Sequence, residues 1–170
     1  MEDISKMKNS RYIFFEYKDF LEPPPPEFNK LMEDQRKEGK YIKSVPMFGL
    51  DSKILPGAFI LSVTIFTEKH GNGPVLSELE HSHDFDEAWI FMGTDMGNPT
   101  DLGGEIDFWL EDDHFIIDKS CMIYVPAGMK RGPCGLSRCD RPIIFFQAAN
   151  EVQYSRTWEG TAEEAESKGQ

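Results

Sequence analysis

Short runs of β-branched and aromatic residues dominate the chain from about Ala58 onward. Each run is closed by glycine, proline, asparagine or aspartate, which are typical of turns. The runs cover residues 58–66, 87–92, 105–110, 115–117, 121–125 and 142–147. Regularly spaced short strands are typical of an antiparallel sandwich or small barrel. The pattern therefore predicts an all-β domain, which we place at residues 51–158.

Both ends of the chain differ from this pattern. Residues 11–17 are aromatic and apolar enough to form a strand, and the prolines at 23–26 predict a stiff, extended segment after it. We therefore expect residues 1–50 to form an arm that packs on the barrel or on a partner subunit. Residues 159–170 are polar and acidic, so we expect a frayed tail.

The arm contains one predicted helix, at residues 27–38. Its apolar residues fall at one-turn spacings on a single face, and charged residues occupy the other face. These apolar residues are Phe28, Leu31 and Met32. Gly39 follows at the position where glycine commonly ends a helix.

Composition narrows the class of protein. The 170 residues are 39% hydrophobic and 28% charged, as expected for one globular domain. Thirty acidic residues against eighteen basic ones give a net charge of −12, which disfavours nucleic acid and anionic membranes as partners. No apolar run reaches the ~18 residues of a membrane span, and no signal peptide is evident. Three cysteines indicate a reducing compartment, so we expect a cytoplasmic protein.

Two histidines and a glutamate form the main candidate site. On a strand, alternate side chains share a face, so His81, His83 and Glu87 would point the same way, whereas Asp86 would point away. Two imidazoles and a carboxylate can hold one divalent metal and leave coordination positions open. The alternative is a solvated polar loop, because Glu80, Asp84 and Asp86 crowd the same stretch.

Two segments resemble the paired motifs of the cupin superfamily. Residues 81–87, with Gly93 ending the strand that follows, resemble the first motif. Residues 122–128, where a strand leads into a Pro-x-Gly turn, resemble the second. The resemblance covers residues 58–149. It implies a small antiparallel barrel or jelly roll with a metal or a small molecule in its mouth, and commonly a homodimer. Cupin activities include dioxygenases, isomerases, epimerases and decarboxylases, so the fold leaves the reaction open.

One position departs from the cupin pattern. The second motif usually supplies a histidine where this chain has Arg131. Arginine stays protonated and offers only donors, so it cannot ligate a metal. Three hypotheses follow: Arg131 holds an anionic substrate beside a three-ligand metal, it pairs with Glu87 and replaces the metal, or it turns outward without a role.

We expect Trp89, Phe91 and Tyr124 as candidates to line a substrate cavity, with core packing as the alternative. The predicted function is a cupin that binds Fe, Mn, Zn, Ni or Co through His81, His83 and Glu87. It would act on a small oxygenated or carboxylate-bearing molecule oriented by Arg131. The alternatives are a non-catalytic binding barrel in which Arg131 replaces the metal and a purely structural dimer module.

Overall fold

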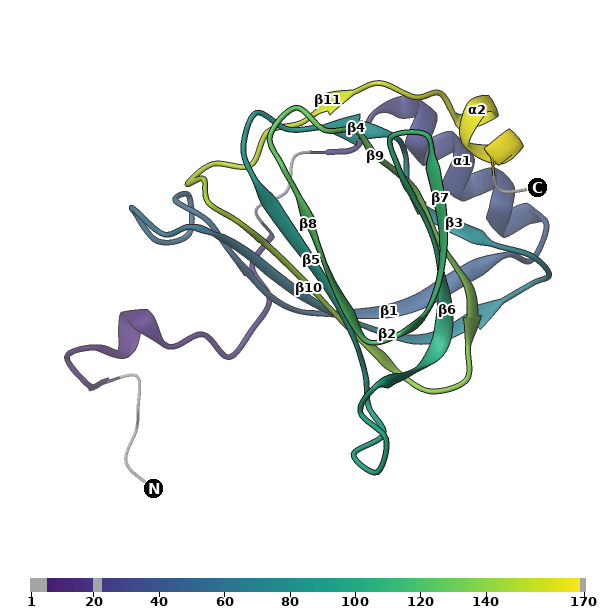
Figure 1. Cartoon of the computed structure of the whole chain (residues 1–170). Coiled ribbons are helices and arrows are strands. Elements are labelled where there is room, and N and C mark those ends of the chain that lie inside the picture. Colours follow the sequence, from purple (N-terminus) through teal and green to yellow (C-terminus); the bar gives the residue numbers. More distant parts are fainter. Residues whose placement is uncertain (1–5, 20–22, 169–170) are drawn as a thin grey trace.

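The computed structural model describes residues 6–19 and 23–168, and two antiparallel sheets form its body (Figure 1). The first sheet has the order β1 (Tyr41–Leu50), β2 (Ile60–His70), β10 (Ile143–Ala149), β5 (Glu87–Gly93) and β8 (Cys121–Val125). The second has the order β11 (Thr157–Trp158), β4 (His81–Ser82), β9 (Arg131–Cys139), β6 (Asp101–Leu110) and β7 (Asp113–Lys119), and β3 (Val75–Glu78) also pairs with β9. The predicted all-β antiparallel barrel is confirmed.

The main core lies between the two sheets and follows from alternation along the strands. In β5, Glu87, Trp89 and Phe91 are buried on the inner face, whereas Met92 is exposed. Side chains of β6, β9 and β10 complete this core: Leu102, Ile106, Phe108, Cys134, Leu136 and Ile143. Because each strand turns one face inward, burying the apolar half of the sequence also brings Glu87 inside.

Strand β1 lies in residues that the sequence pattern assigns to the arm. It pairs with β2 from Tyr41 opposite His70 to Leu50 opposite Leu61, with two register shifts. Pro46 interrupts the sequence pattern, but β1 is an edge strand, where proline is tolerated because no neighbour needs its missing N–H. The arm is therefore shorter than expected, and residues 41–50 belong to the barrel sheet.

The predicted helix is confirmed as α1 (Pro26–Lys37). The buried Leu31 packs in a cluster with Leu76, Leu79 and Ala165. Ala165 belongs to α2 (Ala162–Lys168), a helix within the tail that we expected to be frayed, and the two helices lie beside each other in Figure 1. Within residues 6–19 and 23–168, no helix has the length and apolar character needed to cross a membrane.

The aromatic segment at residues 11–17 does not form the expected strand. A short 3-10 helix, η2 (Ser10–Tyr12), precedes an irregular stretch in which Ile13 and Phe15 are exposed. An extended segment forms a strand only when another strand pairs with its backbone, and no strand in the described part of the chain pairs with these residues. In Figure 1 this segment extends away from the barrel.

Candidate metal centre

His81, His83 and Glu87 meet inside the barrel. His81 begins β4, Glu87 begins β5, and His83 lies between these strands. One ligand atom of each residue lies within 4.8 Å of the others, and all three side chains are buried. Burial alternates from His83 to Glu87 although β4 ends at Ser82, so the three side chains share one face without a continuous strand. The solvated-loop alternative is therefore wrong.

Backbone carbonyls fix the tautomers of both histidines. The Nδ1 atom of His81 lies 2.8 Å from the carbonyl oxygen of Leu79, and Nδ1 of His83 contacts the carbonyl oxygen of Ser155. A carbonyl only accepts, so each Nδ1 carries the proton and each Nε2 keeps its lone pair. Among the described residues, Nε2 of His81 is buried without a hydrogen-bond partner. This arrangement is the one that metal-binding histidines use.

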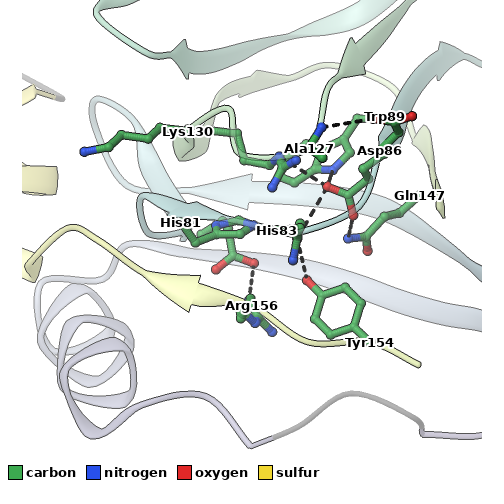
Figure 2. Close-up of polar contacts among 12 residues, drawn as sticks. His81, His83, Asp86, Trp89, Ala127, Lys130, Gln147, Tyr154 and Arg156 are labelled. Atoms are coloured by element: carbon green, nitrogen blue, oxygen red, sulfur yellow. Dashed lines mark hydrogen bonds and ion pairs between the residues drawn. The ribbon is translucent and has the colours of Figure 1, made fainter. Parts of the chain in front are cut away.

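Aromatic rings hold the His83 imidazole in place. Phe85 stacks on it at a centroid distance of 4.6 Å, and Tyr154 meets it edge-on at 5.1 Å. The Tyr154 hydroxyl lies 3.5 Å from Nε2 of His83, as the dashed line in Figure 2 shows. The ring is therefore oriented before any ligand binds, which lowers the entropy cost of binding.

The Glu87 carboxylate is held by two donors on the same sheet. Trp89 Nε1 donates to Oε2 at 2.6 Å, and Gln147 Nε2 donates to Oε1. Ser62 donates to the other atom of the Gln147 amide, Oε1, at 3.3 Å, which fixes the amide orientation. Burial raises the pKa of Glu87, whereas Arg131 and these donors favour its charged form.

Arg131 lies in the second sheet, beside His81, and faces Glu87 of the first sheet. It begins β9 directly opposite His81, and its side chain is fully buried. Its Nε lies 3.4 Å from Oε2 of Glu87, close enough for an ion pair. None of its three guanidinium nitrogens has a hydrogen-bond partner within the described residues. The hypothesis that Arg131 turns outward is therefore wrong.

A glycine allows β9 to approach β4. Gly132 has a φ of +87°, and a Cβ atom there would lie 2.6 Å from the carbonyl oxygen of Leu79. That oxygen is also the one that accepts the hydrogen bond from His81. An L side chain would thus be strained and would displace the group that orients His81.

Burial also sets the charge of the histidines. Desolvation lowers the pKa of His81 well below its usual value and the pKa of His83 to about 4. The positive charge of Arg131 adds to both effects. Both rings are therefore neutral at pH 7. The Nε2 lone pairs of His81 and His83 and the carboxylate of Glu87 lie close enough together to bind one ion.

The three cavity candidates divide into two groups. Trp89 and Phe91 line a cavity of about 330 Å³, in agreement with their parity with Glu87. Tyr124 does not, because its side chain is 58% exposed on the outer face, where it pairs with Asp86. Successive residues of a strand point to opposite faces of the sheet, so the next residue, Val125, is buried whereas Tyr124 is exposed.

Several residues of the site carry no sequence signal. Gln147 lies in an ordinary β pattern, and Tyr154 and Arg156 lie in an irregular C-terminal segment. Arg156 pairs with Glu78 at 2.9 Å and covers the ring of Tyr154, next to the histidines (Figure 2). Only the packing of distant strands brings these residues to the site.

Comparison with models of protein families gave no match for this sequence, and comparison with curated sequences gave none either. Solved structures with similar strand arrangements include the DMSP lyase DddQ of Ruegeria pomeroyi (14% identity, TM-score 0.40), matched over 69% of this chain and 51% of the lyase. This chain thus spans about half the length of that lyase.

Two further similar structures are cupins by their descriptions. A sugar phosphate isomerase from Silicibacter pomeroyi is 14% identical over 82% of this chain and 74% of its own, with a TM-score of 0.49. A cupin-like protein of Thermotoga maritima is 15% identical over 75% and 84%, with a TM-score of 0.46. The chain has two antiparallel sheets, and its two motifs lie on neighbouring strands, with Glu87 paired to Val125 and His81 to Arg131. This is a cupin fold.

Proposed function

We propose that the chain binds one divalent metal through His81, His83 and Glu87 and holds an anionic group of a small molecule with Arg131. One observation carries this proposal. The buried Nε2 of His81 has a lone pair without a donor, and the buried Arg131 guanidinium has donors without an acceptor. A buried group without its partner costs ~1–3 kcal/mol. A metal ion beside the histidines and an anion beside Arg131 would satisfy both.

The residues present fit a metal. Two neutral imidazoles with fixed tautomers and one carboxylate suit Fe, Mn, Co, Ni or Zn. Both donors to Glu87 act as the outer partners that orient a ligating carboxylate. A divalent metal there supplies Lewis acidity toward an oxygen of the bound molecule.

The chain's own groups position and shield that molecule. Arg131 can donate forked hydrogen bonds to a carboxylate, which fixes its orientation. Tyr154 keeps its proton at pH 7, because burial raises the pKa of its hydroxyl, and this hydroxyl lies next to His83. The complete burial of Arg131 and Glu87 keeps bulk water from the charged groups and strengthens their interaction with a ligand. These features support a small oxygenated or carboxylate-bearing molecule as the substrate.

Metal content tests this proposal. The protein is loaded in turn with Fe, Mn, Co, Ni and Zn, desalted and measured by elemental mass spectrometry. The parent should retain about one ion per chain, and His83→Ala should lose at least ~90% of it. His70→Ala is the matched control, because His70 is a partly exposed histidine paired with Glu68 and lies outside the cluster. A parent that retains well under one ion of every metal would contradict the proposal.

The contact between Arg131 and Glu87 favours a second candidate function. A guanidinium 3.4 Å from the carboxylate already supplies the positive charge that a metal would bring. The chain would then be a metal-free binding barrel. In that case Arg131→His should create a metal affinity that the parent lacks, whereas a parent that binds metal tightly excludes this function.

A further inference from the structure

A cavity of about 330 Å³ lies between helix α1 and the inner face of the first sheet. It is separate from the metal centre, because its lining includes neither Arg131 nor any of the three candidate ligands. Trp89 and Gln147 line it, and both also donate to Glu87. The cavity therefore adjoins the metal centre across these two side chains.

The inner end of the cavity is aromatic. Phe91 and Phe145 stack at a centroid distance of 4.8 Å, and Trp89 meets Phe145 edge-on at 5.4 Å. Dry apolar cavities of ~150 Å³ bind benzene. A cavity twice as large has room for a ring or branched chain of about ten non-hydrogen atoms.

The outer end carries two cations. Arg36 and Lys40 both line the cavity, and Lys40 also pairs with Glu38 at 2.8 Å. Within the described residues, no hydrogen bond or ion pair engages the Arg36 side chain. Glu78 lines the cavity too, but its charge is compensated by Arg156 at 2.9 Å. The net charge available to a ligand at this end is therefore positive.

Helix α1 holds Arg36 at the cavity. The adjacent Gln35 is buried, and its amide donates to the carbonyl oxygen of Leu76 at 3.0 Å and accepts from the Leu76 N–H at 2.8 Å. Leu31, one turn earlier, packs against Leu76 and Leu79. The helix is therefore fixed to β3 at Leu76, and Arg36 is presented from a rigid element.

We propose that this cavity is a second binding site, for a small carboxylic acid with an apolar body. The body lies against the aromatic residues Trp89, Phe91 and Phe145, and the carboxylate faces Arg36 and Lys40. Arg36 determines specificity for the acid, since its donors are free. The site goes beyond the proposed metal function and does not require a metal.

Calorimetry with a matched pair of probes tests this site. Protein treated with EDTA is titrated with 3-phenylpropanoate and with 3-phenylpropanol, which differ in the acidic group. We expect the acid to bind at least tenfold more tightly. Arg36→Gln should weaken the acid about tenfold and leave the alcohol within twofold. Lys37→Gln, the neighbouring exposed cation that pairs with Asp34 and does not line the cavity, should change neither.

Tryptophan emission locates the bound probe. Trp89 lines the cavity, whereas Trp109 and Trp158 do not. The acid should shift the emission of the parent, and Trp89→Phe should remove that shift. Equal affinities for the two probes, an Arg36→Gln variant like the parent, or no binding of either probe would overturn the inference. Because EDTA removes metal, failure here and failure of the metal proposal are separate results.

Discussion

The two sides of the buried cluster differ in how complete they are. On the first-motif side, each candidate ligand is held by partners: carbonyl oxygens hold His81 and His83, and two side-chain donors hold Glu87. On the second-motif side, Arg131 is equally buried but has no hydrogen-bond acceptor among the described residues. In the folded chain the candidate ligands thus already have their hydrogen-bond partners, whereas Arg131 gains acceptors only when an anion binds.

Removing the charge of Glu87 should have the largest effect on the contact between the ligand side and the arginine side of the cluster. Glu87→Gln keeps the shape of the side chain but leaves a buried cation without its counter-charge, so we expect a loss of ~3–5 kcal/mol in the free energy of unfolding. Urea denaturation measures this loss. Glu68→Gln, which breaks an exposed pair with Lys43 that solvent screens, should cost much less. Similar losses in the two variants would show that the Arg131 pair is no different from a surface pair.

Loss of an outer partner of Glu87 should have a smaller effect. Gln147→Leu removes the donor to Oε1, so the carboxylate is less well oriented, and metal affinity should fall 10–100-fold. Competition with a coloured chelator measures the affinity. Asn150→Leu is the control, because Asn150 binds Asp86 outside the cluster, and it should leave the affinity unchanged. Equal affinities of parent and Gln147→Leu would contradict preorganisation of the ligand side.

The neutral state of His83 predicts a pH dependence of stability. Its folded pKa is about 4 and its ordinary value is 6.5, so the unfolded chain binds a proton in this interval that the folded chain does not. The contribution is full above pH 6.5 and is lost as the pH falls toward 4. In the metal-free protein, the difference in free energy of unfolding between parent and His83→Phe should change over this window. Parallel curves for the parent and His83→Phe would contradict the prediction.

Tyr124 should show the smallest effect. Its side chain lies on the outer face, away from the cluster and from the cavity, so Tyr124→Phe should change metal affinity less than about twofold. The same chelator competition measures it. A larger change would mean that the second motif contacts the centre through Tyr124 as well as through Arg131.

Much of the fold could be predicted because the relevant signals are local. Alternation marked β2, β5 and β10, and one-turn spacing marked α1 to within a residue of each end. Strand β1 was missed because Pro46 breaks the pattern, which only its place at the sheet edge makes acceptable. Helix α2 was missed because it is short and polar, and Ala165 becomes buried only against α1 and β3.

Within the site, sequence alone determined that His81, His83 and Glu87 share a face, because alternation is a property of one chain segment. It also determined that the second motif offers an arginine at position 131. Only the tertiary structure decided that Arg131 points inward at Glu87 and that Gln147 and Tyr154 complete the centre. Those contacts join residues tens of positions apart, and they depend on the register between strands, which local sequence does not specify.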